Sequence, residues 1–166
     1  GKRPKSYGHP QAFPRDWKAG LVKRIIIYAP NVGGGGGLVL LRALLSTTWQ
    51  GQRPLAILDE RGRSALEGLD AEIDIKWVKS STFGRFGAER LLARSARSND
   101  RVFCFHNLPP IFPVAGDVVC FVHNAYIAGS VPLSGLKGWV RKRLKIERLI
   151  AGLFHYRVDT YVVQTQ

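Results

Sequence analysis

Short β-branched runs alternate with helical segments along this chain, and this alternation limits the possible folds more than any other feature of the sequence. We expect strands at residues 22–29, 54–60, 73–78, 101–105, 117–123 and 159–164, and helices at 38–50, 64–69, 84–98 and 139–156. Strands separated by helices need crossover connections, which produce a mainly parallel sheet with helices on both faces. The sequence therefore predicts one α/β domain, Rossmann-like and doubly wound, at residues 21–166 behind a basic tail at 1–20.

The ligand sites of doubly wound sheets lie beyond the carboxyl ends of the strands. In this chain a glycine run follows the first expected strand, and polar residues follow four others. These polar residues are Asp59, His106, Asn107, His123, Asn124, Gln164 and Thr165. A histidine ring or an asparagine amide at such a position can hydrogen-bond a hydroxyl group or a phosphate oxygen. We therefore expect a binding site at this edge, with His123 as its leading residue.

The glycine run joins the first expected strand to the first expected helix. It consists of Gly33, Gly34, Gly35, Gly36 and Gly37. Glycine lets the backbone approach a ligand closely, and the start of a helix offers free N–H groups that suit a phosphate. The Walker motif needs Lys and Ser or Thr after its last glycine, which this run lacks, and a dinucleotide fingerprint that starts at Gly33 needs glycine in place of Leu38. We expect phosphate or substrate binding here without either motif.

Other catalytic motifs are missing from the sequence. Neither His106-Asn107 nor His123-Asn124 belongs to an HExxH or HxH motif or to a carboxylate cluster, so we expect no metal and no cofactor. The GxSxG motif is absent as well, so we expect no Ser-His-Asp triad. Cys104 and Cys120 stand inside apolar runs without CxxC spacing. We expect both to be buried, unreactive thiols.

The chain carries a formal net charge of +13, which favours an anionic partner: nucleic acid, a membrane surface or a phosphate-bearing ligand. The expected helix at 139–156 concentrates part of this charge. Its basic residues are Arg141, Lys142, Arg143, Lys145 and Arg148. Its apolar residues Ile146, Ile150, Leu153 and Phe154 share another face. We expect the apolar face to pack on the core, and the basic face, mainly Arg141, Lys142, Lys145 and Arg148, to lie on an anionic membrane.

Four segments resemble the amino-terminal domain of retaining GT-B glycosyltransferases, in particular the large family-four group of sugar-nucleotide transferases. IIIYAPNVGGGGGLVLLRALL resembles its first strand, glycine-rich turn and first helix. FCFHNLPP and VVCFVHNAY resemble the ends of its fourth and fifth strands, where a histidine closes the strand. DTYVVQTQ resembles the last strand of that domain. The resemblance covers residues 22–166 in the order of their elements.

The resemblance implies an enzyme of two Rossmann-like domains that transfers a sugar from a nucleotide-diphosphate donor with retention of configuration and without a metal. The amino domain would hold mainly the acceptor, a glycan or a lipid-linked molecule. The donor would bind mainly to a carboxyl domain, which we expect to be absent from this chain. The glycine run would approach the donor diphosphate or the acceptor, and His123 would lie near the transferred sugar. The resemblance also implies a cytoplasmic protein, peripheral on the inner face of the membrane, and little turnover by this chain alone.

Two alternatives stay open from the residues themselves. The chain would be the dinucleotide-binding domain of an oxidoreductase if Asp59 bound a ribose, although the glycine pattern does not fit the fingerprint. It would be a basic nucleic-acid or membrane-binding module if the net charge were its main functional feature. No RNP motif or zinc-finger spacing supports the nucleic-acid reading, so we expect no nucleic-acid partner.

Overall fold

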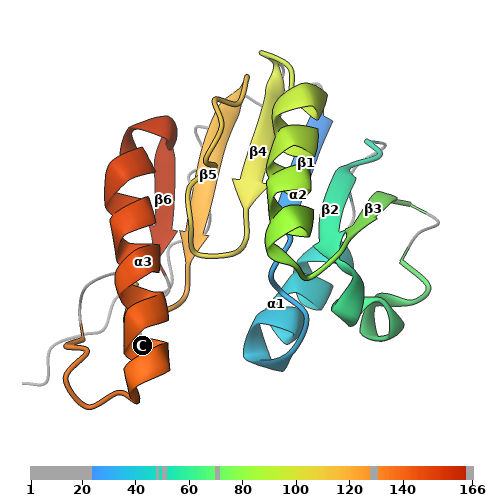
Figure 1. Cartoon of the computed structure of the whole chain (residues 1–166). Helices are drawn as coiled ribbons and strands as arrows, with labels where there is room; N and C mark the ends of the chain where they lie inside the picture. The colour runs from blue at the N-terminus through green and yellow to red at the C-terminus, as the bar shows by residue number, and fades with distance from the viewer. Residues whose placement is uncertain (1–23, 48, 50–51, 70–71, 128–130, 164–166) are drawn as a thin grey trace, which may run out of the picture.

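A computed structural model describes residues 24–47, 49, 52–69, 72–127 and 131–163 of this chain (Figure 1). Its strands are β1 (Arg24–Ala29), β2 (Leu55–Asp59), β3 (Asp74–Val78), β4 (Asp100–Cys104), β5 (Asp117–Val122) and β6 (Thr160–Val163). Its helices are α1 (Gly35–Leu45), α2 (Thr82–Ser95) and α3 (Gly138–Phe154), with short 3₁₀ helices η1 (Glu60–Gly62), η2 (Ser64–Leu66) and η3 (His155–Arg157). The predicted tail at 1–20 and the residues Gln164 and Thr165 lie outside the described residues.

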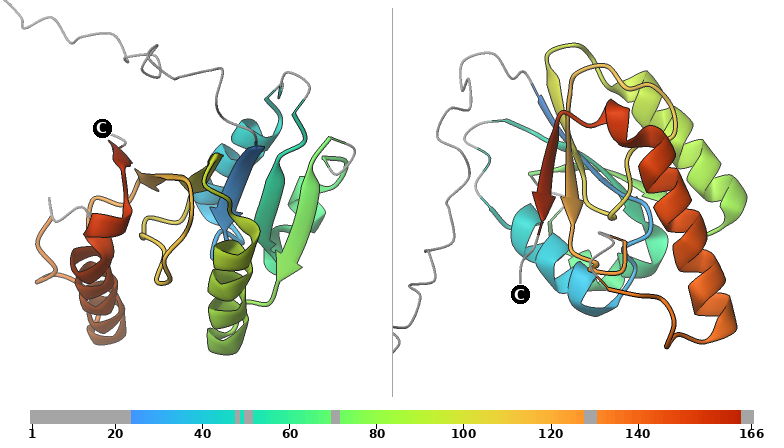
Figure 2. Two further views of the ribbon diagram at one scale, coloured as in Figure 1. Left: turned by 90° about the horizontal axis from the view of Figure 1, so that it is seen from above. Right: turned by 90° about the vertical axis from the view of Figure 1, so that its left-hand side faces the viewer.

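The strands form one parallel sheet in the order β3-β2-β1-β4-β5-β6. Helix α1 covers one face of this sheet, whereas α2 and α3 lie on the other (Figure 2). The prediction of a Rossmann-like, doubly wound α/β fold is therefore confirmed. The chain leaves β1 toward β2 and later returns to β4 on the opposite side of β1, and ligands of doubly wound sheets bind at such a reversal.

The core has two layers because successive residues of a strand point to opposite faces of the sheet. Ile26 and Tyr28 of β1 belong to the layer that includes Leu92 of α2. Ile27 belongs to the other layer, with Leu41 of α1. Every residue of β2 is buried, which explains why its sequence is an apolar run without alternation.

Helix α1 begins and ends earlier than its sequence pattern predicts. It starts at Gly35 rather than at Leu38, so three glycines form part of its first turn. It ends at Leu45, before the predicted end at residue 50, because the following hydroxyl groups bind the last carbonyls. Ser46 Oγ donates to the carbonyl of Arg42 at 2.9 Å, and Thr47 Oγ1 donates to that of Leu44 at 2.8 Å.

The other predicted elements are found close to their expected places. Each predicted strand is confirmed with its described ends displaced by one residue or less. The predicted helix at 64–69 is instead the short 3₁₀ helix η2, which ends at Leu66. Cys104 and Cys120 are both buried and free, as expected.

The face that α3 turns toward the sheet differs from the prediction. Leu144 is its buried residue, with Val140 and Ala151 half-buried on the same side of the helix. Of the four residues expected to pack on the core, Ile150 and Phe154 are half-buried, whereas Ile146 and Leu153 are 58% and 56% exposed. The reason is that Val140, Leu144 and Ala151 form a second apolar face, at i, i+4 and i+11, and this narrower face is the one that meets the sheet. No helix in the described part of the chain is long and apolar enough to cross a bilayer.

Candidate functional site

The glycine loop, residues 33–37, lies at the carboxyl edge of the sheet and opens α1. Gly34 caps the helix with an extended backbone, no side chain caps the helix, and the first turn contains no acidic residue. A Cβ atom at Gly34, Gly35 or Gly36 would have no neighbour within 4 Å. The first N–H groups of α1 thus have no side-chain cap, and the open space beside their glycines leaves room for a phosphate or a sugar hydroxyl.

The glycine loop meets His123 at this edge. A Cβ atom at Gly37 would lie 3.6 Å from Nε2 of His123 and 3.4 Å from the side chain of Val32. A glycine at this position therefore lets the first turn of α1 come against the imidazole. The loop after β1 and the residue after β5 thus share one edge of the sheet.

Asn107 holds His123 in place from the neighbouring strand end. Its Oδ1 accepts hydrogen bonds from the backbone N–H of His123 at 2.8 Å and of Asn124 at 3.0 Å. Its Nδ2 lies 3.2 Å from Nε2 of His123. Asn107 has a φ of 69°, in the left-handed region that asparagine tolerates better than most residues. The sequence placed this residue at the site but gave no sign of this bracing role.

The contacts of Asn107 determine which nitrogen of His123 carries the proton. Because Oδ1 is taken by two N–H donors, the amide Nδ2 must face the ring and donate to Nε2. Nε2 is then the acceptor nitrogen, and the proton of the neutral ring is on Nδ1. Burial lowers the pKa of His123, which also favours the neutral ring.

Replacing Asn107 by aspartate is expected to raise the pKa of His123. The carboxylate keeps the acceptor for the two backbone N–H groups, but it puts a negative charge beside Nε2 in place of a donor, and this favours the protonated ring. A pH titration of the His123 ring resonances by NMR measures the effect, with the other described histidines as internal references. An unchanged His123 pKa in N107D would contradict the inferred orientation of the amide.

Two other predicted site residues, Asn124 and His106, have structural roles. Asn124 Oδ1 accepts from the N–H of Tyr126 at 3.0 Å and so forms a turn. His106 is 5% exposed, and its ring packs edge-on against Tyr28 with centroids 5.0 Å apart. Burial lowers the pKa of His106 to about 3, so the ring is neutral. His106 was expected to bind substrate, but its burial beneath the site gives it a packing role instead.

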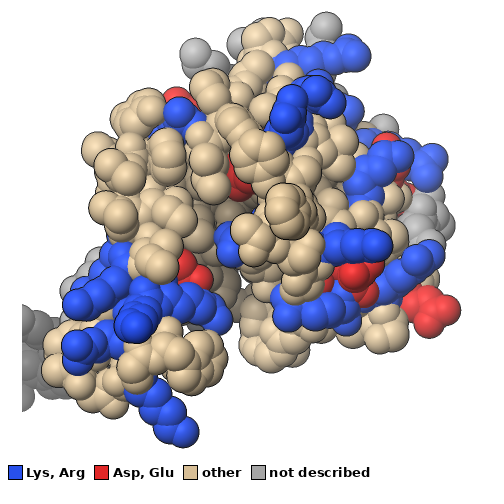
Figure 3. Space-filling view, viewed as in Figure 1, with Lys and Arg blue, Asp and Glu red and all other residues tan. Residues whose placement is uncertain are grey.

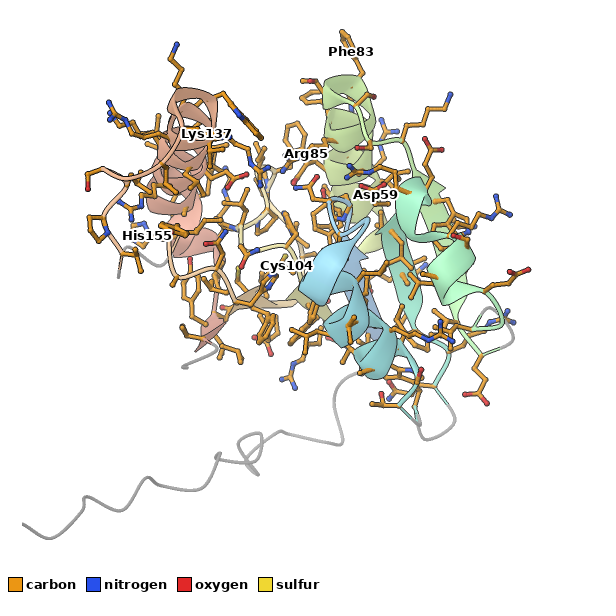
Figure 4. The ribbon with its side chains drawn as sticks, turned by 90° about the horizontal axis from the view of Figure 1, so that it is seen from below. Asp59, Phe83, Arg85, Cys104, Lys137 and His155 are labelled. Carbon is orange, nitrogen blue, oxygen red and sulfur yellow. The ribbon has the colours of Figure 1, made fainter. Side chains whose placement is uncertain are left out.

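A buried acidic group near Tyr28 was missed by the sequence analysis. Glu89 of α2 is 4% exposed and accepts the N–H of Ile111 at 2.8 Å, which ties α2 to the loop after β4. Burial raises the pKa of Glu89, and the charge of Arg85 acts against this rise. Arg85, which lies on α2 (Figure 4), also lowers the pKa of His106 through its charge. The i, i+4 spacing of Arg85 and Glu89 was the available sequence signal.

Arg61 is the second residue that the sequence analysis missed. It follows β2 in the turn η1, and its Nε lies 2.8 Å from where a Cβ atom at Gly33 would be. Its guanidinium binds the buried carboxylate of Asp59, with Nη2 2.6 Å from Oδ2 and Nε 3.0 Å from Oδ1. Although burial opposes it, the hydrogen bonds from Arg61 lower the pKa of Asp59. This pair places a half-exposed cation against the glycine loop.

The same pair weighs against the dinucleotide alternative. A ribose-binding acid must offer free carboxylate oxygens to the 2′- and 3′-hydroxyls. Asp59 is fully buried, and both its oxygens accept from Arg61, which also donates its backbone N–H at 2.9 Å.

Comparisons with known proteins add no assignment. The chain matches no protein-family model, no curated protein and no solved structure. Within residues 24–163, the described ranges contain no group of three His, Cys, Asp or Glu side chains that could hold a metal ion. The function is therefore inferred from the residues at the carboxyl edge of the sheet.

The basic residues of α3 divide into two groups. Arg141, Lys142 and Lys145 are exposed, as the prediction of a basic surface requires. Arg148 is half-buried: its Nε donates to the carbonyl of Tyr126 at 2.6 Å and its Nη2 to that of Val131 at 2.7 Å. Arg148 thus fixes the loop before α3 and does not belong to the exposed basic face.

Proposed function

We propose that this chain is the acceptor-side domain of a retaining glycosyltransferase that transfers a sugar from a nucleotide-diphosphate donor to a glycan or a lipid-linked acceptor. The contact of the glycine loop with His123 is the observation that supports this most. It sets free helix N–H groups beside a neutral imidazole at the switch point of a doubly wound sheet. Sugar phosphates present the phosphate oxygens that such N–H groups bind.

Each group at this edge has a distinct part in the proposal. The N–H groups of Gly35, Gly36 and Gly37 bind an anionic oxygen, because they are unpaired at the positive end of the α1 dipole. Arg61 adds a guanidinium group at the side of the loop, next to Gly33, although Asp59 balances part of its charge. His123 is held neutral and oriented by Asn107, so its ring borders the ligand space without attracting a second anion.

Transfer would need a second domain that supplies the nucleotide and sugar contacts of the donor. We therefore expect this chain to bind the donor weakly, through its diphosphate at the glycine loop, and to turn over little. We also propose that the domain is cytoplasmic and peripheral on the inner face of the membrane. The exposed Arg141, Lys142 and Lys145 of α3 support this position.

The G36A variant tests the ligand site. A methyl group at Gly36 would touch no protein atom within 4 Å, so the fold should not change. It would protrude where a bound phosphate must approach the backbone, and we expect binding of a nucleotide-diphosphate sugar to weaken about tenfold or more. Titration calorimetry with UDP-glucose and GDP-mannose measures this effect.

Gly87 provides the matched control for that test. It also lies in a helix, with no neighbour within 4 Å of its Cβ position, but on α2 and away from the glycine loop. G87A should therefore bind the same sugars as the wild type. Equal binding by G36A and the wild type would contradict the site, and stronger binding of NAD⁺ than of any nucleotide sugar would favour the oxidoreductase alternative.

A further inference from the structure

Helices α2 and α3 form one surface on the same side of the sheet. In Figure 2 both project from the face opposite to α1. Both follow a strand at its carboxyl end, α2 after β3 and α3 after β5, and both run back toward the amino edge. The first turns of both helices therefore lie at the edge of the sheet that carries the candidate site.

The outward side of α3 is apolar. Trp139, Ile146, Leu149 and Leu153 are 67%, 58%, 60% and 56% exposed. Their spacing of seven, three and four residues places them in one stripe along the helix, opposite the buried Leu144. Helix α3 is thus apolar on both sides, and only the narrower inner side is covered within the described residues.

Helix α2 adds exposed aromatic rings to the same surface. Phe83 is 90% exposed, and it points away from the body of the molecule at the outer end of α2 (Figure 4). Phe86 is 51% exposed and packs edge-on against Phe112 with centroids 5.2 Å apart. An open pocket of about 480 Å³ adjoins these rings, with Arg90 and Arg94 among its lining residues. Exposed apolar side chains that gather in one patch, unlike single ones, mark an interaction surface.

The charges around these apolar side chains are nearly all positive. Arg141, Lys142 and Lys145 flank the stripe of α3, and Arg90 and Arg94 are exposed on α2. Figure 3 shows Lys and Arg gathered over the lower part of α3 and around α2, with mainly uncharged surface and a few acidic atoms between them. The acids of the two helices do not compensate, because Glu89 is buried and Glu147 is paired with Arg143 at 2.9 Å.

We propose that α2 and α3 together form a membrane-docking face that binds an anionic lipid surface. Trp139, Leu149 and Leu153 with Phe83 enter the boundary between headgroups and acyl chains, and the flanking lysines and arginines bind lipid phosphates. The inference deepens the proposed peripheral position and rests on it. It adds the insertion of specific side chains from two helices, which orients the candidate site along the bilayer surface, within reach of a lipid-linked acceptor.

The mixture of residues favours lipid over other anionic partners. A nucleic acid would use the cations but would gain nothing from aliphatic side chains such as Ile146 and Leu149. The core of a protein interface is depleted of lysine, yet Lys142 lies within the α3 stripe, between Trp139 and Ile146. At a membrane, a lysine in this position extends its stem along the apolar surface and its charge into the headgroups.

Vesicle sedimentation with the full chain tests this proposal. We expect binding to vesicles that contain phosphatidylglycerol and little binding to phosphatidylcholine alone. L149S should weaken binding roughly tenfold, through lost apolar burial. The double variant K142Q/K145Q should weaken it roughly 30-fold, because each cation near the surface contributes to binding. Brominated lipids should quench a tryptophan signal that W139F lacks.

The matched control is V39S. Val39 is 69% exposed but lies on α1, on the opposite face of the sheet, so V39S should bind vesicles like the wild type. Equal losses for V39S and L149S would overturn the proposal. So would a chain that prefers RNA to anionic vesicles, or one whose α3 stripe forms a dimer that L149S dissociates without any lipid binding.

The sugar-binding experiment separates this inference from the function on which it rests. L149S changes no residue of the glycine loop, so it should bind nucleotide sugars like the wild type. If sugar binding is normal and vesicle binding is absent, only the docking face is wrong. If vesicles bind as expected and no nucleotide sugar does, the glycosyltransferase assignment is wrong and a membrane-binding module remains.

Discussion

Replacing Gly116 by alanine is expected to lower the free energy of unfolding by about 3 kcal/mol. Gly116 has a φ of 94°, a conformation that costs a residue with a side chain roughly 1–2 kcal/mol. A Cβ atom there would also lie 2.3 Å from the carbonyl oxygen of Asp100 and 2.7 Å from that of Arg97. Backbone atoms must move to relieve such contacts, which adds roughly 1–3 kcal/mol.

The position of Gly116 in the fold explains why this movement is costly. It directly precedes β5, and Asp100 opens the neighbouring strand β4. The Asp100 carboxylate is 3% exposed and binds both Nη2 of Arg24 and the N–H of Arg97, each within 3.0 Å. Displacing this turn therefore disturbs a partly buried ion pair at the amino edge of β1 and β4.

Urea denaturation of G116A and the wild type measures the difference, with G87A as the control. Alanine at Gly87 meets open space inside α2, so it should raise the stability by up to ~1 kcal/mol through the better helix propensity of alanine. Similar denaturation midpoints for G116A and the wild type would show that the turn before β5 relaxes freely.

The sequence predicted the sheet well because both faces of its central strands are buried. A fully buried strand such as β2 must be a continuous apolar run, and such runs are visible without any structure. The start of α1 was harder to predict, because glycines carry no side-chain signal for a helix start. The orientation of α3 could not be predicted, because the helix is apolar on two sides and the choice between them depends on the shape of the sheet beneath Leu144.

The sequence predicted which strand ends form the candidate site, but it did not predict the contacts between their residues. The glycine loop and His123 were expected at one edge because parallel strands end together. The role of Arg61 depends on the turn η1, which brings its side chain back to Asp59 and Gly33. The bracing by Asn107 depends on a positive φ. Such local backbone conformations have no periodic sequence pattern.

Acidification is expected to destabilise the fold through His106, by about 3 kcal/mol between pH 7 and pH 4. Burial lowers the pKa of this ring from 6.5 to about 3 in the folded chain, with a further contribution from the charge of Arg85. The unfolded chain therefore binds a proton below pH 6.5, whereas the folded chain does not until about pH 3. The stability is fully present above pH 6.5 and is lost as the pH falls toward 3.

The variant H106F isolates this contribution, because a phenyl ring can keep the edge-on packing against Tyr28 and cannot titrate. Denaturation midpoints at pH 7 and pH 4 give the slope for each protein. Other groups affect the slope as well: the lowered pKa of His123 acts in the same sense, and the raised pKa of Glu89 acts in the opposite sense. Both groups remain in H106F, so the difference in pH dependence between H106F and the wild type is due to His106. Equal slopes would mean that the His106 ring can take up a proton within the fold, for example by turning toward the candidate site, where an anionic ligand would then meet it.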